Sequence, residues 1–132
     1  MEAKDEKLNI LLVDDDKFLV DMYCMKFAAS GCNPHACLSV DDALQVLRDG
    51  FNPHAIIFDV VMPEHDGFYL LKTLGEENLG KGAVRIALTN ESDDATKSKM
   101  IELGADRVII KASMIPSEVV DAVKKEVERR KA

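Results

Sequence analysis

The sequence predicts an α/β domain with a doubly wound, five-stranded parallel sheet and helices on both faces. Short apolar segments alternate five times with segments of helical length and spacing. The apolar segments are nearly continuous, as expected for strands that are covered on both faces. Strands that alternate with helices pair in parallel, and right-handed crossovers place the helices on both sides of the sheet. The 132 residues are enough for one core but too few for two, so we expect a single domain over 1–132.

The first repeat begins with the apolar run from Leu8 to Val13, which we expect to be a central strand. The segment from Lys17 to Ser30 follows as a helix, and Gly31 stands where a left-handed residue would end it. Its apolar residues near helical spacing are Phe18, Leu19, Met22, Tyr23 and Phe27.

The second and third repeats have the same organisation. A weaker strand, His35 to Leu38, precedes a helix that Ser39 would cap together with Asp42. A buried strand, His54 to Phe58, is followed by the turn-rich residues 62–67 and by a third helix. The apolar residues that mark these two helices are Val40, Ala43, Leu44 and Leu47, then Leu70, Leu71 and Leu74.

The last two repeats complete the predicted sheet. A strand over 84–88 ends at Thr89 and leads to a helix that Gly104 ends. A strand over 107–110 ends at Lys111, and Pro116 opens the last helix, 116–131. The apolar stripe of that helix is Val119, Val120, Val123 and Val127. We expect residues 1–6 to be a flexible start.

Composition and charge limit the partners. Lys and Arg number 17 against 24 for Asp and Glu, and a net charge of −7 disfavours direct binding to nucleic acid or anionic membrane. No apolar run approaches the roughly 20 residues that span a bilayer, and the charged start is unlike a signal peptide, so we expect a cytoplasmic protein. Three cysteines and three histidines show neither disulfide nor zinc spacing, and we interpret them as structural.

Polar residues follow four of the predicted strands. Asp14 and Asp15 follow the first, Asp59 the third, Thr89 the fourth and Lys111 the fifth. Ligands of doubly wound sheets bind outside the carboxyl ends of the strands, so these side chains would share one edge. Carboxylates gathered there repel one another unless they are neutralised, and a site of oxygen ligands that keeps several waters suits Mg²⁺. We therefore expect a bound Mg²⁺ ion.

This set of residues suggests phosphoryl chemistry. A carboxylate beside Mg²⁺ can attack phosphorus and form an aspartyl phosphate, and Asp59 stands alone at a strand end before a tight turn. Lys111 would supply a cation for the phosphoryl group, and the rotating hydroxyl of Thr89 could donate to a phosphoryl oxygen. Structural roles are the alternative for two nearby acids, because Asp16 and Asp66 stand where helix caps are expected.

The chain resembles the receiver domains of two-component response regulators over nearly its whole length. Thr89 lies 30 residues after Asp59, and Lys111 lies 22 residues after Thr89, as in that family. The matching segments are Asp14-Asp15, Asp59-Val-Val-Met-Pro-Glu-His-Asp-Gly67, Thr89, Glu102-Leu-Gly-Ala-Asp106 and Lys111.

The resemblance implies a flavodoxin-like fold with strand order 2-1-3-4-5 and phosphorylation of Asp59 by a histidine kinase or phosphotransfer protein. Asp14, Asp15 and Asp59 would hold Mg²⁺ with the backbone carbonyl of Val61. Lys111 would pair with the phosphoryl group. Thr89 would be drawn toward it and change the protein-binding surface around the fourth helix and fifth strand. Such a protein is a stoichiometric phosphoacceptor rather than an enzyme, although self-phosphorylation from a phosphodonor and slow self-dephosphorylation are compatible with it.

Three residues depart from the family's pattern. Ala112 follows the lysine where the family usually has Pro, often after a cis bond, and we expect a trans bond because a cis bond to Ala costs about 2.5–4 kcal/mol. Val108 replaces the aromatic residue that rotates with the threonine, so an aromatic switch cannot operate. Asn90 is larger than the usual residue and would alter access to the phosphoryl group.

Other interpretations stay open. We expect no output domain within these residues, which would be either a standalone regulator or a receiver excised from a longer one. The departures at Val108, Ala112 and Asn90 also suit a receiver-fold interaction module that works without phosphorylation. A phosphatase of the aspartyl-phosphate kind would need an acid two residues after the nucleophile, and Val61 occupies that position.

Overall fold

The computed structural model describes residues 7–131; the expected flexible start, 1–6, lies outside the described residues. The strands are β1 (Asn9–Val13), β2 (Asn33–Cys37), β3 (Ala55–Phe58), β4 (Val84–Thr89) and β5 (Arg107–Ile110). The helices are α1 (Lys17–Ala29), α2 (Val40–Arg48), α3 (Gly67–Glu77), α4 (Asp94–Glu102) and α5 (Pro116–Lys131), and a short 3₁₀ helix, η2 (Lys111–Ser113), joins β5 to α5. Each predicted element is present, with ends shifted by two residues or fewer.

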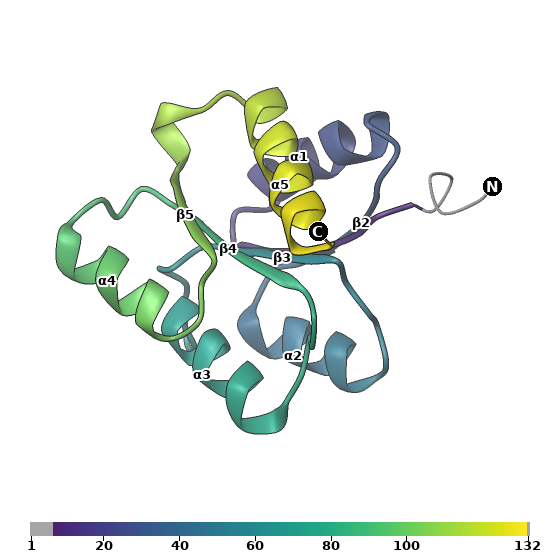
Figure 1. Ribbon diagram of the computed structural model, residues 1–132. Helices are drawn as coiled ribbons and strands as arrows, with labels where there is room; N and C mark the ends of the chain where they lie inside the picture. The colour runs from purple at the N-terminus through teal and green to yellow at the C-terminus, as the bar shows by residue number, and fades with distance from the viewer. Residues whose placement is uncertain (1–6, 132) are drawn as a thin grey trace.

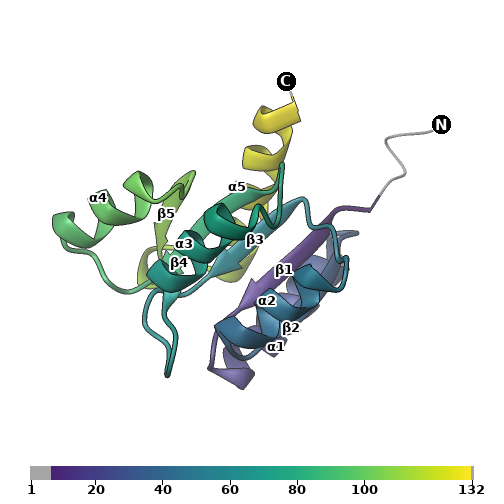
Figure 2. The same ribbon diagram turned by 90° about the horizontal axis from the view of Figure 1, so that it is seen from below.

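The five strands form one parallel sheet in the order β2-β1-β3-β4-β5, which confirms the predicted flavodoxin-like topology. Helices α1 and α5 cover one face, and α2, α3 and α4 cover the other (Figure 1). In the view from below, α2 and α3 lie in front of the strands and α5 lies behind them (Figure 2). None of the helices within residues 7–131 is both long enough and apolar enough to cross a membrane.

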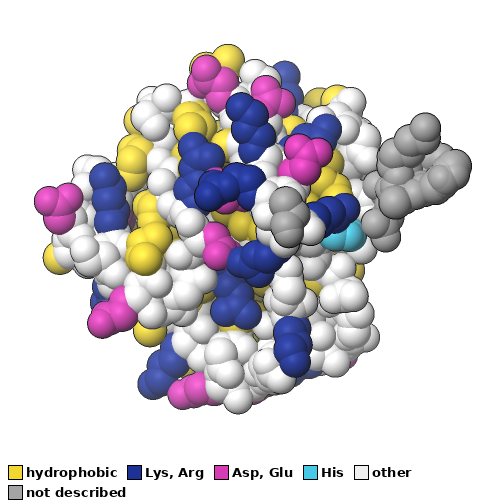
Figure 3. Space-filling model, viewed as in Figure 1, with side chains coloured by type: hydrophobic (Ala, Val, Ile, Leu, Met, Phe, Trp, Pro, Cys, Tyr) yellow, Lys and Arg dark blue, Asp and Glu magenta, His cyan; other side chains and the backbone are white. Residues whose placement is uncertain are grey.

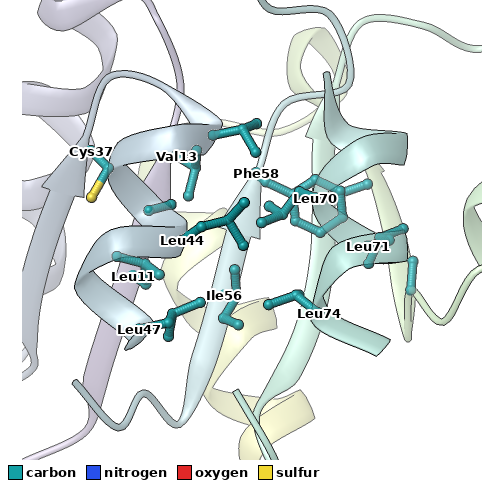
Figure 4. Close-up of a cluster of buried hydrophobic side chains, with 14 of the residues drawn as sticks. Leu11, Val13, Cys37, Leu44, Leu47, Ile56, Phe58, Leu70, Leu71 and Leu74 are labelled. Carbon is teal, nitrogen blue, oxygen red and sulfur yellow. The ribbon is translucent and has the colours of Figure 1, made fainter. Parts of the chain in front are cut away.

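Side chains of the central strands alternate between two cores because successive residues of a strand point to opposite faces. Leu11 of β1 and Ile56 of β3 point into the core beneath α2 and α3 (Figure 4). Their neighbours Leu12 and Ile57 point into the core beneath α1 and α5. The central strands β1 and β3 are therefore buried on both sides, and their ends are held in fixed register.

Several helix ends confirm the predictions from sequence. The Ser39 side chain accepts a hydrogen bond from the Asp42 N–H at the start of α2. Gly31 and Gly104 have positive φ angles of 86° and 115° just after α1 and α4, in conformations that side chains disfavour. Both helices thus end at the positions that were predicted from these two glycines.

The apolar face expected for α1 needs one correction. Phe18 shares the apolar spacing but is 84% exposed. The buried residues of this helix are Val20, Tyr23 and Phe27. Phe18 lies two residues before Val20, about 200° around the helix, so it faces away from the sheet.

The basic end of α5 is paired with acidic side chains. Figure 3 shows Lys and Arg side chains among Asp and Glu side chains around this end of the helix. Arg130 lies 2.7 Å from Asp106, and Arg129 lies 3.1 Å from Glu126. These pairs, and the favourable position of cations at a helix C-terminus, explain the basic tail without a nucleic-acid ligand.

Candidate functional site

The parallel register brings the first and third strand ends together. Val13 pairs with Phe58, so Asp14 and Asp59, one residue further on, leave the sheet side by side. The Asp59 N–H donates to the Val13 carbonyl at 3.0 Å, which extends the sheet to the first residue of the loop. The backbone at both carboxylates is therefore fixed by the core strands.

Three carboxylates meet at this edge. Asp14, Asp15 and Asp59 each offer an oxygen, and these oxygens lie within 4.8 Å of one another. Asp14 is buried, Asp59 is partly buried and Asp15 is exposed, so the group opens to solvent. Oxygen ligands that leave room for water are the donor set that Mg²⁺ favours. The residues present thus fit the predicted magnesium site.

Lys111 reaches the carboxylates from the end of β5. Its Nζ lies 2.8 Å from Oδ2 of Asp14 and 2.8 Å from Oδ2 of Asp59. All three side chains are at most 15% exposed, so these ion pairs are largely shielded from solvent. The ammonium group therefore neutralises part of the acidic charge.

Burial and neighbouring groups shift the pKa values of Asp14 and Lys111. Burial raises the pKa of Asp14 above its usual 3.8, against the lowering effect of hydrogen bonds from Lys111 and from the Asp16 N–H. Burial by itself would lower the pKa of Lys111, but its hydrogen bonds to Asp14 and Asp59 and their negative charges outweigh burial, so the pKa lies above 10.5. Lys111 is consequently a cation at neutral pH.

Thr89 ends β4 at the same edge but faces its own loop. The side chain is buried, and its Oγ1 accepts a hydrogen bond of 3.1 Å from the Glu91 N–H. Within the described residues it makes no hydrogen bond to Asp59 or Lys111. Since the hydroxyl accepts here, its proton stays available for another acceptor.

The loop after β3 holds Asp59 tightly. Oδ1 of Asp59 accepts a hydrogen bond of 2.7 Å from the Val60 N–H, and the Gly67 N–H donates to the Val60 carbonyl. A Cβ at Gly67 would lie only 2.7 Å from the Asp59 carbonyl oxygen, so a side chain at this position would force the loop backbone to shift. Val61 is 60% exposed, and the metal-binding role of its carbonyl stays a prediction.

The two acids interpreted as caps do cap helices. The Asp16 side chain accepts from the Leu19 N–H at the start of α1. The Asp66 side chain accepts from the Tyr69 N–H at the start of α3.

Two histidines contact residues distant in sequence, and the cysteines are not paired with one another. His54 Nδ1 accepts from the Asn9 N–H, and His65 Nδ1 lies 2.8 Å from Asp41. Cys32 and Cys37 are buried, whereas Cys24 is half-buried, and all three are free thiols.

Two details of the site were not foreseen from sequence. One is the close packing of Gly67 against the backbone of the Asp59 loop. An Asp-Gly pair signals a turn, but it does not show which backbone approaches the glycine. The other joins two of the departures from the family pattern, because the Asn90 Oδ1 accepts a hydrogen bond of 3.0 Å from the Ala112 N–H. The peptide bond before Ala112 is trans, as expected.

A parallel sheet of this order with acids, a hydroxyl and a lysine at its strand ends is the arrangement expected of a receiver domain, and the family comparison agrees. The family model for the response regulator receiver domain matches residues 10–124. The chain belongs to the response regulator receiver family.

Two curated relatives are similar to the chain over most of its length. The chain is 27% identical over 115 residues to the phosphate regulon transcriptional regulatory protein PhoB of Escherichia coli, covering 87% of this chain and 49% of PhoB. It thus spans about half the length of that relative. Protein PilG of Pseudomonas aeruginosa is 24% identical over 124 residues, covering 94% of this chain and 90% of PilG.

The fold is shared with solved receiver domains. A CheY-like receiver domain protein from Methanospirillum hungatei superposes with a TM-score of 0.86 at 21% identity, covering 96% of this chain and 98% of that one. The BeF3-activated DrrB receiver domain gives a TM-score of 0.79 at 27% identity, covering 93% of this chain and 99% of that one.

Proposed function

We propose that this chain is a phosphoacceptor whose Asp59 takes a phosphoryl group in a Mg²⁺-dependent phosphorelay. One observation carries the proposal: the partly buried Asp59 carboxylate lies at the carboxyl-end edge of the sheet, beside two further carboxylates and 2.8 Å from the Lys111 ammonium. That arrangement combines a nucleophile with the positive charge that a transferring phosphoryl group needs.

The proposed step is a transfer from phosphohistidine of a histidine kinase or phosphotransfer protein. A carboxylate oxygen of Asp59 forms a bond to phosphorus as the phosphorus–nitrogen bond breaks, and the released imidazole nitrogen is neutralised by a proton. Lys111 lies within reach of the Asp59 oxygen and would pair with the phosphoryl oxygens. The protein is then the acceptor in a stoichiometric transfer, in which self-phosphorylation from a small donor follows the same chemistry.

Asp14, Asp15 and Asp59 would hold the metal, together with the Val61 carbonyl. Bound Mg²⁺ supplies positive charge that neutralises the phosphoryl oxygens during transfer. Asp14 is fixed by its hydrogen bond from the Asp16 N–H, at 3.0 Å, and Asp15 contributes an exposed carboxylate. The rigid and the exposed ligand together would orient the ion and leave space for water.

Thr89 would report the phosphoryl group to the rest of the protein. Its hydroxyl, which accepts from the Glu91 N–H, would donate its proton to a phosphoryl oxygen and draw the β4–α4 loop with it. Val108 is half-buried against the core on the α2–α4 side and provides no aromatic ring for a coupled rotation. The signal would therefore reach a protein partner through movement of the β4–α4 loop and of α4.

Mass spectrometry of the intact protein tests this function. Incubation with phosphoramidate and Mg²⁺ is expected to add one phosphoryl group to the native chain. An Asp59→Ala variant should gain none, whereas Asp66→Ala, which removes only a helix cap, should be modified like the parent. Equal modification of the parent and Asp59→Ala would refute the assignment, as would no modification of the parent with any donor.

A phosphorylation-independent interaction module is the second candidate, and the half-buried Val108 in place of a rotating aromatic residue favours it. The two candidates differ in what beryllofluoride does. A phosphoacceptor should show chemical-shift changes in Thr89 and α4 when Mg²⁺ and beryllofluoride are added, whereas the second candidate predicts none.

A further inference from the structure

A side-chain hydrogen bond ties together the two loops that carry Thr89 and Lys111. Asn90 directly follows Thr89, and its Oδ1 accepts from the Ala112 N–H at 3.0 Å. Ala112 directly follows Lys111 in the short helix η2. The bond thus joins two residues, each of which directly follows a predicted site residue in the sequence.

The bond requires both departures from the usual receiver sequence at once. Proline at position 112 would have no N–H to donate. A small apolar residue at position 90 would have no acceptor. The side chain at 90 and the backbone at 112 are therefore matched to each other, which accounts for two departures with one contact.

The contact bears on Lys111 because it ties that turn to another loop, whereas the other side-chain hydrogen bond there, from Ser113 Oγ to the Ile110 carbonyl at 2.8 Å, is local to the turn. Thr89 and Ile110 pair as neighbours on β4 and β5, so the sheet ends just before Lys111. Beyond this point η2 has only three residues, none of which is buried. The amine must nevertheless stay within 2.8 Å of both Asp14 and Asp59. A second anchor on the Ala112 backbone restricts the path of the chain at the base of the lysine.

We propose that Asn90 is a positioning residue that holds Lys111 at the acidic cluster through the Ala112 N–H, in place of a conformationally fixed proline. The inference rests on the proposed function where it concerns phosphorylation. Its structural part, the placement of the Lys111 amine, is measurable without any phosphodonor.

Three substitutions of Asn90 distinguish the effect of the hydrogen bond from the effect of side-chain size. Asn90→Leu keeps the approximate size of the side chain but removes the acceptor, and Asn90→Ala removes both. Asn90→Asp keeps size and acceptor. Asn33→Leu is the matched control, because Asn33 also makes an exposed side-chain hydrogen bond, to Asn9, at the opposite edge of the sheet. Both positions are on the surface, and circular dichroism verifies that all four variants fold.

Two measurements are made on each protein. Amide hydrogen exchange at Ala112 and the ¹⁵Nζ resonance of Lys111 report the bond and the ion pairs without phosphodonor, and the rate of modification by phosphoramidate with Mg²⁺ reports function. We expect Asn90→Leu and Asn90→Ala to exchange about fivefold faster at Ala112, to shift the Lys111 resonance and to be phosphorylated about threefold more slowly, as loss of one exposed hydrogen bond implies. Asn90→Asp should retain the parent's exchange rate, and Asn33→Leu should match the parent throughout.

The outcomes decide the two proposals separately. If Asn90→Leu leaves the Ala112 exchange rate or the Lys111 resonance unchanged, the positioning role is wrong. If both change while phosphorylation of a competent parent does not, the role in phosphorylation is wrong. If the parent itself takes up no phosphoryl group, the proposed function fails, and the exchange rate and the Lys111 resonance still decide whether Asn90 positions the lysine.

Discussion

Asp14 is a residue in which the requirements of stability and of the proposed metal binding conflict. Its carboxylate is buried beside another acid, and burial raises its pKa. An acid with a raised pKa in the folded state binds protons more tightly there than in the unfolded chain. Its contribution to stability is present at low pH and is lost as the pH rises through the folded pKa.

Asp14→Asn is therefore expected to stabilise the protein when no Mg²⁺ is added. The gain should be about 1 kcal/mol at pH 7.5, because the amide avoids burying a charge, and its single oxygen still accepts one of the two hydrogen bonds, from Lys111 or from the Asp16 N–H. It should shrink as the pH falls toward 3.8, the ordinary pKa of the group. Urea unfolding at several pH values measures this effect.

Asp16→Asn is the control for that experiment. Asparagine caps a helix about as well as aspartate does, so the free energy of unfolding should hardly change. Added Mg²⁺ should stabilise the parent and Asp16→Asn, and stabilise Asp14→Asn less. A loss of stability in Asp14→Asn at pH 7.5 would contradict the electrostatic explanation.

Cys37 illustrates how burial controls chemical reactivity. Burial, and to a smaller extent the charge of Asp42, raises the pKa of its thiol to about 11. At pH 8 only about one molecule in a thousand would carry the thiolate, which is the reactive form. Native protein treated with iodoacetamide should therefore be modified first at half-buried Cys24, as peptide mapping would show. Preferential labelling of Cys37 would contradict this order.

At the scale of elements, the start of α3 is the contact that fixes the loop of Asp59. Gly67 packs so closely on the loop backbone that any side chain must push Asp59 or Phe58 aside. Gly75, near the other end of the same helix, has no atom near its missing Cβ. The two glycines thus differ only in their surroundings.

Opposite effects are expected when each glycine becomes alanine. Gly67→Ala should lower the free energy of unfolding by about 1–3 kcal/mol through overpacking. Gly75→Ala should raise it by about 0.5–1 kcal/mol, because alanine favours the helix. Urea unfolding of both variants gives the comparison, and equal effects of the same sign would show that the close contact is unimportant.

At the scale of the whole molecule, one sheet supports two cores. Ile56 and Ile57 are adjacent in β3, are both almost fully buried and point into opposite cores. Since the same strand supports both cores, neither should unfold alone.

Ile56→Val and Ile57→Val should consequently affect one common transition. Each is expected to cost about 0.5–1.5 kcal/mol and to lower the midpoint seen by far-ultraviolet circular dichroism and by tyrosine fluorescence equally. Ile115→Val, at a residue that is 61% exposed, should leave the midpoint unchanged. Midpoints that differ between the two probes would indicate independent unfolding of the two sides.

The fold could be predicted from the sequence because its determinants are local patterns. Apolar strands that alternate with helices permit few topologies, and parallel pairing then places Asp14 beside Asp59. Loop conformation is not encoded in this way. The orientation of Thr89 toward Glu91 and the bond from Ala112 to Asn90 depend on neighbours that are distant in sequence or on the path of short turns. Phe18 has apolar character, but only the docking angle of α1 decides that it is exposed.

Lys111 forms ion pairs with Asp14 and Asp59, so the acidic edge has a counterion that belongs to the chain itself. A counterion within the chain cannot be chelated or diluted. Removal of dissolved cations should therefore abolish only the activity that needs them, while the loops keep their arrangement. The protein would remain folded, and the metal-dependent activity would return when the metal is added back.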